Sequence, residues 1–292
     1  MRGFSDYNPI AVSLYVLSVA GIAMFCMNPT ILVLSLFASV LLFFVKQGKG
    51  DVFSHIALLA LFFAMALINP LVSHNGATVL FVINDSIITA EALIYGFAAA
   101  AMIISVIYWF RSFSALMTED KLLYVFGSFS PKTALILSMG IRYISLLGRQ
   151  RKKTEQAQRA MGLYKEDNIV DRTKGGIRIF SVIVTWALEN GIITADSMAA
   201  RGYGLSSRTH FSKFKFHVSD AVLIISIICA DALIITAISL GTLDFAFYPK
   251  LCAAEPSLLG SFAYVAYAAL VFLPVFIEVG VSLKWKFLRS KI

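Results

Sequence analysis

Long apolar stretches separated by polar segments dominate the pattern of this chain. A helix that crosses a bilayer needs about 20 predominantly apolar residues. Four candidate stretches precede a long polar block and two follow it: about Pro9–Met27, Pro29–Val45, Val52–Val72, Ile87–Phe110, Ala221–Leu240 and Leu258–Leu283. The pattern therefore predicts an all-α integral membrane protein with about six transmembrane helices.

The polar block follows helical periodicity. Four helices are expected in it, over 112–129, 133–162, 175–191 and 194–202. Glycine commonly follows the last residue of a helix, so Gly162, Gly191 and Gly202 are the predicted stops. The chain divides accordingly into four transmembrane helices in 1–111, a cytoplasmic helical coupling region in 112–216 and two transmembrane helices in 217–292.

A rival arrangement makes one of the shorter apolar pieces, 133–147 or 177–188, into a membrane span. Arg142 interrupts the first piece and Arg178 lies at the start of the second. Helices that lie at the membrane surface or pack under the spans are therefore preferred.

The composition supports a membrane protein. Hydrophobic residues make up 59% of the 292 residues and charged residues only 14%, whereas a soluble domain carries about 25% charged residues. Mean hydropathy is +0.80. The three cysteines are widely spaced and the four histidines form no cluster, so neither a disulfide framework nor a metal site is indicated.

The positive charge is concentrated in one internal block. Residues 142–215 contain 14 Lys and Arg against 6 Asp and Glu, while the rest of the chain has eleven of each. Loops rich in Lys and Arg stay cytoplasmic, so this block should face the cytoplasm. An ordinary basic loop beside acidic lipids would look the same, and no nucleic-acid-binding motif accompanies the charge.

The links set the orientation. The basic link 46–51 and the basic tail after Leu283 should lie inside, and the links 27–29 and 73–86, without Lys or Arg, outside. Both termini of this multi-pass protein are therefore expected in the cytoplasm.

Two helix ends in the basic block share a form, "AQRAMG" (157–162) and "MAARG" (198–202). Each carries small residues and an arginine and stops at glycine. Such an arginine could hydrogen-bond the last carbonyls of its own helix. It could instead present its planar fork of donors to a carboxylate of a partner, and the paired occurrence favours this second interpretation.

On "SMAARGYG" (197–204) and "IRYISLLGRQRKKTEQAQRAMG" (141–162), the sequence resembles the transmembrane T component of energy-coupling factor (ECF) transporters, in the cobalt-transport permease family. The resemblance implies a prokaryotic cell-membrane subunit without catalytic residues or an ATP site. Two ABC-type ATPases, which bind ATP and Mg²⁺, would hold its motif helices. A membrane-embedded S component would capture a vitamin or transition-metal ion.

The second motif matches that family fully. Ala200, Arg201 and Gly202 occupy its Ala-Arg-Gly positions. The resemblance implies that Arg201 faces acidic residues in a groove of one ATPase.

The first motif matches in part. Ala157, Gln158 and Gly162 match, but Met161 stands where the family has arginine. The nearest arginine, Arg159, lies two positions earlier, about 200° around the helix. Either Arg159 reaches round or the adaptable Met161 makes the contact, and such unequal ends would suit a heterodimeric ATPase.

Asp231 lies near the middle of the fifth predicted span, where an ionisable residue is costly and often functional. A bond to a neighbouring helix or a partner is favoured over a substrate or proton site. No phosphate-binding Gly-Lys-Ser/Thr loop is present. A self-contained membrane carrier or lipid-modifying enzyme is the rival function, and it would act without partners.

Overall fold

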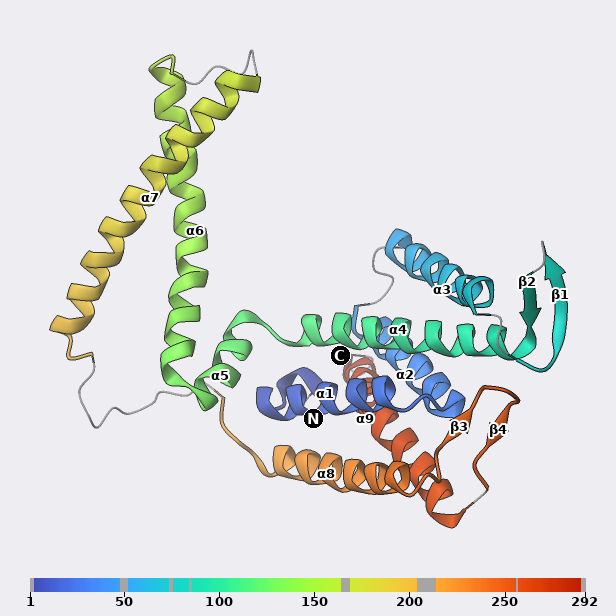
Figure 1. The fold of residues 1–292 in the computed structure, drawn as a ribbon. Helices are drawn as coiled ribbons and strands as arrows, with labels where there is room; N and C mark the ends of the chain where they lie inside the picture. Colours follow the sequence, from blue (N-terminus) through green and yellow to red (C-terminus); the bar gives the residue numbers. More distant parts are fainter. Residues whose placement is uncertain are drawn as a thin grey trace. The chain divides into compact units, whose positions relative to one another are not determined.

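A computed structural model describes residues 3–47, 52–73, 76–83, 86–163, 169–203, 214–255 and 257–289. The chain forms two compact units. The first is discontinuous and combines Met1–Leu122 with Phe214–Ile292, and the second is Leu123–Lys213. Each unit is described by itself (Figure 1).

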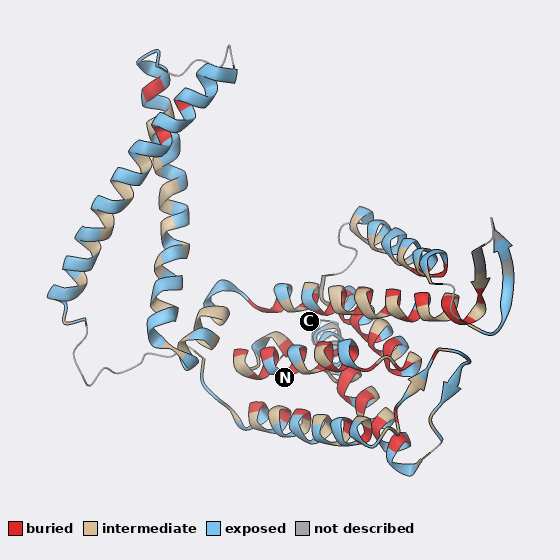
Figure 2. Cartoon of the chain, viewed as in Figure 1, coloured by how far each residue is buried: buried red, intermediate tan, exposed pale blue. Residues whose placement is uncertain are grey.

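The first unit is a bundle of apolar helices. A short 3₁₀ helix, η1, precedes six α-helices: η1 Phe4–Asp6, α1 Pro9–Phe25, α2 Pro29–Gln47, α3 Val52–Val72, α4 Ala90–Leu116, α8 Val218–Ser239 and α9 Leu258–Arg289. Helix α4 packs against α1, α2 and α3, and α9 packs against α2 and α8. Most of the buried positions in Figure 2 lie on these helices.

The chain is an all-α integral membrane protein in which, within the described residues, six helices are long and apolar enough to cross a membrane. Five of these six helices correspond to predicted stretches, and one does not. Helix α1 has 17 residues and is shorter than these six helices. In its place, α7 (Ile169–Ala200) meets the length and composition requirements, and it contains the apolar piece 177–188. Ten residues of α1 are buried, whereas only 6% of the apolar window of α7 is.

The fourth predicted stretch differs from the observed helix at both ends. Residues Ser86–Thr89 form strand β2, which pairs antiparallel with β1 (Val79–Ile83), and α4 begins only at Ala90. The Thr89 hydroxyl caps α4 by accepting the Ala92 N–H. At the other end α4 continues beyond Arg111 to Leu116. A second hairpin, Phe245–Ala246 (β3) with Cys252–Ala253 (β4), connects α8 to α9.

Polar contacts join the N-terminal helices of this unit to its C-terminal helices. We call them the polar seam: Asn8 N–H to Asp220 (2.9 Å), Asn28 to the Leu243 carbonyl (3.0 Å), Tyr15 to the Leu270 carbonyl (3.0 Å), Ser18 to Asp231 (2.7 Å), and Phe4 N–H and Lys46 to Glu278 (3.0 and 2.9 Å). Buried polar groups are stable only when they are paired. The seam therefore gives these polar groups their hydrogen-bond partners. It also joins the N-terminal helices of the discontinuous unit to its C-terminal helices.

An aromatic cluster fills the centre of the same unit. Trp109 and Tyr15 are fully buried, with their rings 5.9 Å apart and nearly perpendicular. The Trp109 indole N–H donates to the Ser35 hydroxyl at 3.0 Å. Burial and pairing of this kind fix how α1, α2 and α4 meet.

The second unit consists of two long helices, α6 (Pro131–Ala160) and α7, preceded by part of α5 (Glu119–Phe129). The Tyr143 hydroxyl lies 3.3 Å from that of Thr194, so the middle of α6 faces the last third of α7. The two helices are antiparallel and cross near the end where α6 stops and α7 starts (Figure 1). The long helix predicted over 133–162 is confirmed.

The predicted stop at Asn190-Gly191 is wrong, because α7 runs without interruption from Ile169 to Ala200. Gly191 does not adopt a positive φ. The Asn190 side chain donates to the Trp186 carbonyl and the Thr194 hydroxyl to the Asn190 carbonyl, at 2.9 and 2.7 Å. These i to i−4 bonds are made within a continuing helix.

Gly96 allows α3 and α4 to approach closely, and this predicts a stability effect. A Cβ atom at Gly96 would lie 2.5 Å from the Ala66 carbonyl oxygen, which is backbone and cannot move aside easily. We expect Gly96→Ala to lower the free energy of unfolding by about 1–3 kcal/mol, measured by denaturant titration in detergent micelles. The matched control is Gly21→Ala in α1, where an added Cβ has no neighbour within 4 Å; an equal loss there would contradict this explanation.

Candidate functional site

The two helix ends that the sequence pairs have the same backbone structure. At the end of α6, the Gly162 N–H donates to the Arg159 carbonyl at 3.0 Å and the Leu163 N–H to the Gln158 carbonyl at 2.9 Å. At the end of α7, Gly202 donates to Ala199 and Tyr203 to Met198, both at 3.0 Å. This is the Schellman pattern. Both glycines have positive φ, 69° and 79°, which confirms them as helix stops.

The shared pattern aligns the two ends residue by residue. Met161 and Arg201 both occupy the capping position, where each N–H donates to the carbonyl four residues earlier. Arg159 therefore corresponds to Ala199 and not to Arg201. The two helix ends therefore differ at one equivalent position, which is Met161 in α6 and Arg201 in α7, while their backbone hydrogen bonds are the same.

The arginine at the end of α7 is open to a partner. Arg201 is exposed, and within the described part of the chain its guanidinium makes no hydrogen bond or ion pair. It lies at the edge of a cavity of about 380 Å³ between α6 and α7. Ten residues line this cavity: Met139, Arg142, Tyr143, Leu146, Asn190, Ile193, Thr194, Ser197, Met198 and Arg201.

The arginine at the end of α6 is already engaged. Arg159 forms an ion pair of 2.8 Å with Glu155, one turn earlier on its own helix. Met161, by contrast, is 63% exposed. At the position equivalent to Arg201, the exposed side chain is therefore the thioether of Met161, and the nearby Ala157 is exposed as well.

Gln158, also matched to the first motif, is not on that surface. It is 4% exposed, and its Oε1 has no hydrogen-bond partner among the described residues. Gly175 and Ile179 are the buried residues of α7, and the buried positions of the pair gather where the helices cross (Figure 2). Gln158 therefore belongs to the contact between α6 and α7.

Two features of the site were not predicted from the sequence. Arg142 lies beside the same cavity as Arg201 because the antiparallel pairing brings the first half of α6 to the last turns of α7. No one-dimensional signal gives that pairing. The Glu155–Arg159 pair, in contrast, has the i, i+4 spacing that favours an ion pair on a helix and could have been found.

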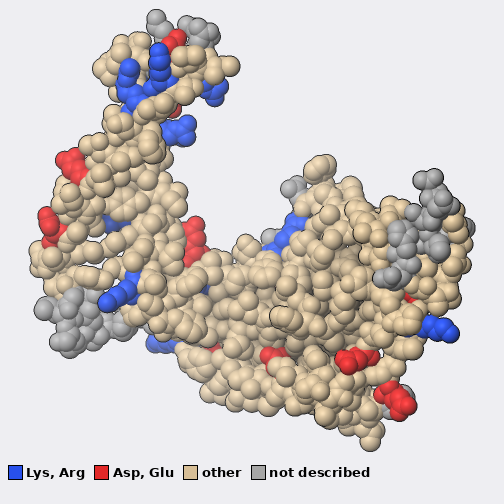
Figure 3. Space-filling model, in the orientation of Figure 1, with Lys and Arg blue, Asp and Glu red and all other residues tan. Residues whose placement is uncertain are grey.

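Basic side chains gather at the end of the α6–α7 pair away from Arg201 (Figure 3). The exposed cations of this cluster are Arg149, Arg151, Lys152, Lys153, Arg172, Lys174 and Arg178. Among the described residues of the block, most of the exposed cations therefore lie towards the end of α6. Two acidic residues, Glu189 and Asp196, precede Arg201 on α7.

Asp231 lies in α8, where its carboxylate accepts a hydrogen bond from Ser18 of α1. It is part of the polar seam. Among the described residues, no three His, Cys, Asp or Glu side chains come together in a way that could hold a metal ion.

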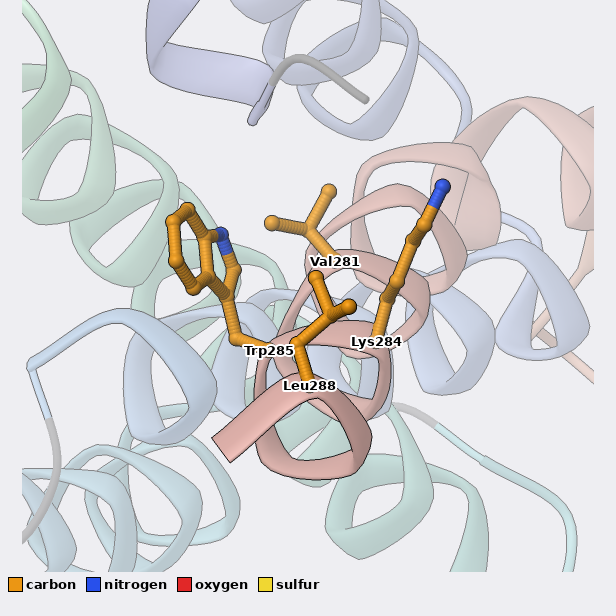
Figure 4. Close-up of a pocket in the computed structure, with 4 residues that line it drawn as sticks. All are labelled: Val281, Lys284, Trp285 and Leu288. Carbon is orange, nitrogen blue, oxygen red and sulfur yellow. The ribbon is translucent and has the colours of Figure 1, made fainter. Parts of the chain in front are cut away.

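A hollow near the end of α9 is too small to bind a substrate. Val281, Lys284, Trp285 and Leu288 project from one side of this helix (Figure 4) around a volume of about 80 Å³. Pockets for small molecules measure about 300–1,000 Å³. The tryptophan beside a lysine is typical of a helix end at a membrane–water interface.

Comparison with known proteins supports a relation over part of the chain. No family model matches. The energy-coupling factor transporter transmembrane protein EcfT 1 of Listeria monocytogenes is 33% identical over 91 residues, which are 30% of this chain. The match covers 34% of that relative, so the chain spans about a third of the length of the curated relative it matches.

The left-handed conformation of Gly202 predicts how the end of α7 responds to substitution. A branched side chain at φ 79° is strained, at a cost of about 1–2 kcal/mol. We expect Gly202→Val to speed hydrogen exchange of the Tyr203 amide about tenfold, with Gly202→Asn intermediate. Gly191→Ala, in the interior of the same helix, is the control; faster exchange in that variant as well would show that the helix as a whole had loosened.

Proposed function

We propose that this protein is the transmembrane coupling subunit, the T component, of an ECF-type importer in a prokaryotic cell membrane. Two cytoplasmic ABC-type ATPases bind ATP and Mg²⁺ and drive it. It passes their motion to a membrane-embedded S component, which carries a vitamin or a transition-metal ion. The chain itself is not an enzyme, binds no cofactor of its own, and has both termini in the cytoplasm.

The observation that carries this proposal is the exposed guanidinium of Arg201, which has no hydrogen-bond or ion-pair partner among the described residues, at a defined helix end. Helix α7 is 32 residues long and its stop is fixed by the Schellman bonds, so a displacement at Arg201 can be passed along a continuous helix. A planar guanidinium binds a carboxylate through two parallel hydrogen bonds. An acidic groove on an ATPase is the partner that fits this chemistry.

The separation of the two helix ends supports two partner subunits. The ends of α6 and α7 lie at opposite ends of an antiparallel pair. Because α6 has 30 residues, they are about 45 Å apart at 1.5 Å per residue. One small groove cannot accept both ends, whereas two copies or two related subunits can accept one end each.

The difference between the ends supports two unlike ATPases. Arg201 offers a charge, while the equivalent position at the end of α6 offers Met161 and the nearby arginine is neutralised by Glu155. A groove matched to methionine needs apolar walls and no buried carboxylate. We infer that the α6 end docks in such a groove.

The apolar surface of the second unit supports contact with lipid or an S component. Side chains along α7 are exposed although they are large and apolar, with Ile177 at 64%, Phe180 at 67%, Leu188 at 65% and Ile192 at 64%. Contiguous apolar surface of this kind marks protein–protein or membrane contacts. The similarity to EcfT 1 points in the same direction.

Reversal of the charge at Arg201 tests the proposal. We expect Arg201→Glu to weaken ATPase binding by about 2–5 kcal/mol, because a carboxylate would face a carboxylate. ATPase subunits should be lost when the tagged protein is purified from its native membrane, and ATP-dependent uptake should fall. The matched control is Arg172→Glu, which makes the same charge change on an exposed residue of α7.

Two outcomes would contradict the proposal. Uptake and co-purification that are unchanged in Arg201→Glu would remove the coupling role of this residue. Transport or lipid modification by the purified chain alone in vesicles would favour the self-contained carrier or enzyme.

Replacing Met161 tests the unequal docking. An arginine at this capping position would restore the likeness to Arg201, and a cation at a helix C-terminus is favoured by about 0.3–1 kcal/mol. An apolar groove offers a buried guanidinium no carboxylate, so we expect Met161→Arg to weaken assembly, measured as the amount of ATPase retained after a salt wash. Ala160→Arg, at the adjacent exposed position, is the control and should keep assembly; assembly that is kept or strengthened in Met161→Arg would contradict an apolar groove.

A further inference from the structure

A groove on the first unit has the features of a lipid site. Its volume is about 340 Å³, within the range of small-molecule pockets. It is lined by α2, α3 and α4 through Leu36, Val40, Phe44, His55, Leu58, Leu59, Phe62, Ile104 and Tyr108. Phe44 and Leu59 are 43% and 60% exposed, so the groove opens sideways, to the surface that a bilayer would cover.

The polar groups of the groove are confined to one end of it. His55 Nδ1 lies 2.9 Å from the Tyr108 hydroxyl, whereas the other side chains that line the groove are apolar. His55 is in the first turn of α3, and Phe44 is in the last turn of α2. This end therefore lies where two transmembrane helices reach the membrane surface, and about 10 Å of apolar wall extends from His55 to Phe62 at 1.5 Å per residue.

Two polar groups at this end have no hydrogen-bond or ion-pair partner among the described residues. His55 Nε2 is buried without a hydrogen bond to any described residue. Arg111, one turn beyond Tyr108 on α4, makes no hydrogen bond or ion pair within the described residues, and its guanidinium carbon lies 4.6 Å from the centre of the Phe43 ring. The His55 ring is 5.1 Å from the same Phe43 ring. A buried polar atom without a partner is costly, and a half-buried arginine normally pairs with an anion.

We propose that this groove binds one acyl chain of an anionic phospholipid, whose phosphate lies between Arg111 and His55. The apolar walls match the chain. The guanidinium matches a phosphate oxygen and the imidazole nitrogen supplies a further hydrogen bond. Lys46, on the same helix as Phe44, is already paired with Glu278, so among the described residues Arg111 is the cation that the headgroup would use. This site belongs to the first unit, whereas the ends of α6 and α7 belong to the second, and it does not depend on the proposed coupling role.

Photolabelling in vesicles tests the site. The full chain is reconstituted into phosphatidylcholine vesicles that contain a trace of phosphatidylglycerol or phosphatidylcholine with a diazirine in one acyl chain. We expect the phosphatidylglycerol probe to label peptides that contain the groove residues about tenfold more than the phosphatidylcholine probe does, the equivalent of one charge-assisted hydrogen bond. Inorganic phosphate at millimolar concentration should not compete, because it lacks the chain.

Two pairs of variants separate the groove from its surroundings. Leu58→Trp fills the groove and should abolish labelling, whereas Leu67→Trp, on an exposed position of the same helix, should not. Arg111→Gln should remove the preference for the anionic probe, whereas Lys284→Gln, with the same charge change on the exposed end of α9, should keep it. The Arg111 pair decides the question even if the larger side chain at position 58 disturbs folding.

Three results would overturn the proposal. The first is equal labelling in both members of each pair. The second is full competition by inorganic phosphate, which would assign the polar end to a free anion. The third is an unlabelled groove in vesicles together with crosslinking of a photoreactive residue at position 58 to another polypeptide in cells, which would assign the groove to a protein partner.

Discussion

Polar groups inside a membrane protein must find their partners within the protein, because the surrounding lipid offers none. In this chain the partners lie at opposite ends of the sequence. Glu278 of α9 holds both the Phe4 N–H and the Lys46 ammonium, and Asp220 of α8 holds the Asn8 N–H. These contacts join the two sequence segments of the first unit, while the intervening segment Leu123–Lys213 forms a unit of its own.

The second unit has few buried residues, and its two long helices share one type of ending. Most of its residues are exposed, yet each of its two long helices ends in the same pair of backbone hydrogen bonds around a left-handed glycine. These bonds satisfy the last carbonyls, so the side chain at the capping position is not needed for that purpose. Both side chains are exposed, and under the proposed function Arg201 contacts an acidic groove and Met161 an apolar one.

The groove beside His55 shows the same need of buried polar groups for partners, here where the described residues do not supply them. In the polar seam every carboxylate accepts a hydrogen bond from another residue of the chain. By contrast, His55 Nε2 and the Arg111 guanidinium make no hydrogen bond or ion pair with any described residue. Both lie where α2 ends and α3 begins, and an apolar groove starts there. The bilayer supplies phosphates at this depth, so a lipid can complete a set of partners that the protein leaves incomplete.

The sequence by itself determined the elements whose cause is local. Apolar length identified five of the six helices that are long and apolar enough to cross a membrane. Glycine identified the stops at 162 and 202, and the repeated arginine-and-glycine ends identified the candidate site. Local rules failed at Asn190 and Gly191, a pair that is typical of a helix stop. Helix α7 continues through both residues, and the side chains of Asn190 and Thr194 hydrogen-bond to carbonyls one turn earlier within it. The extent of α4 was likewise altered by the pairing of β1 with β2.

Only the tertiary structure decided which distant residues meet. The pairing of Ser18 with Asp231, the placing of Arg142 beside Arg201 and the meeting of His55, Phe43 and Arg111 depend on which helices are neighbours. Hydrophobic periodicity records that a face is buried but not what buries it. The aligned helix ends show the same limit: sequence spacing found the motif, and the backbone hydrogen bonds established that Met161, and not Arg159, is the counterpart of Arg201.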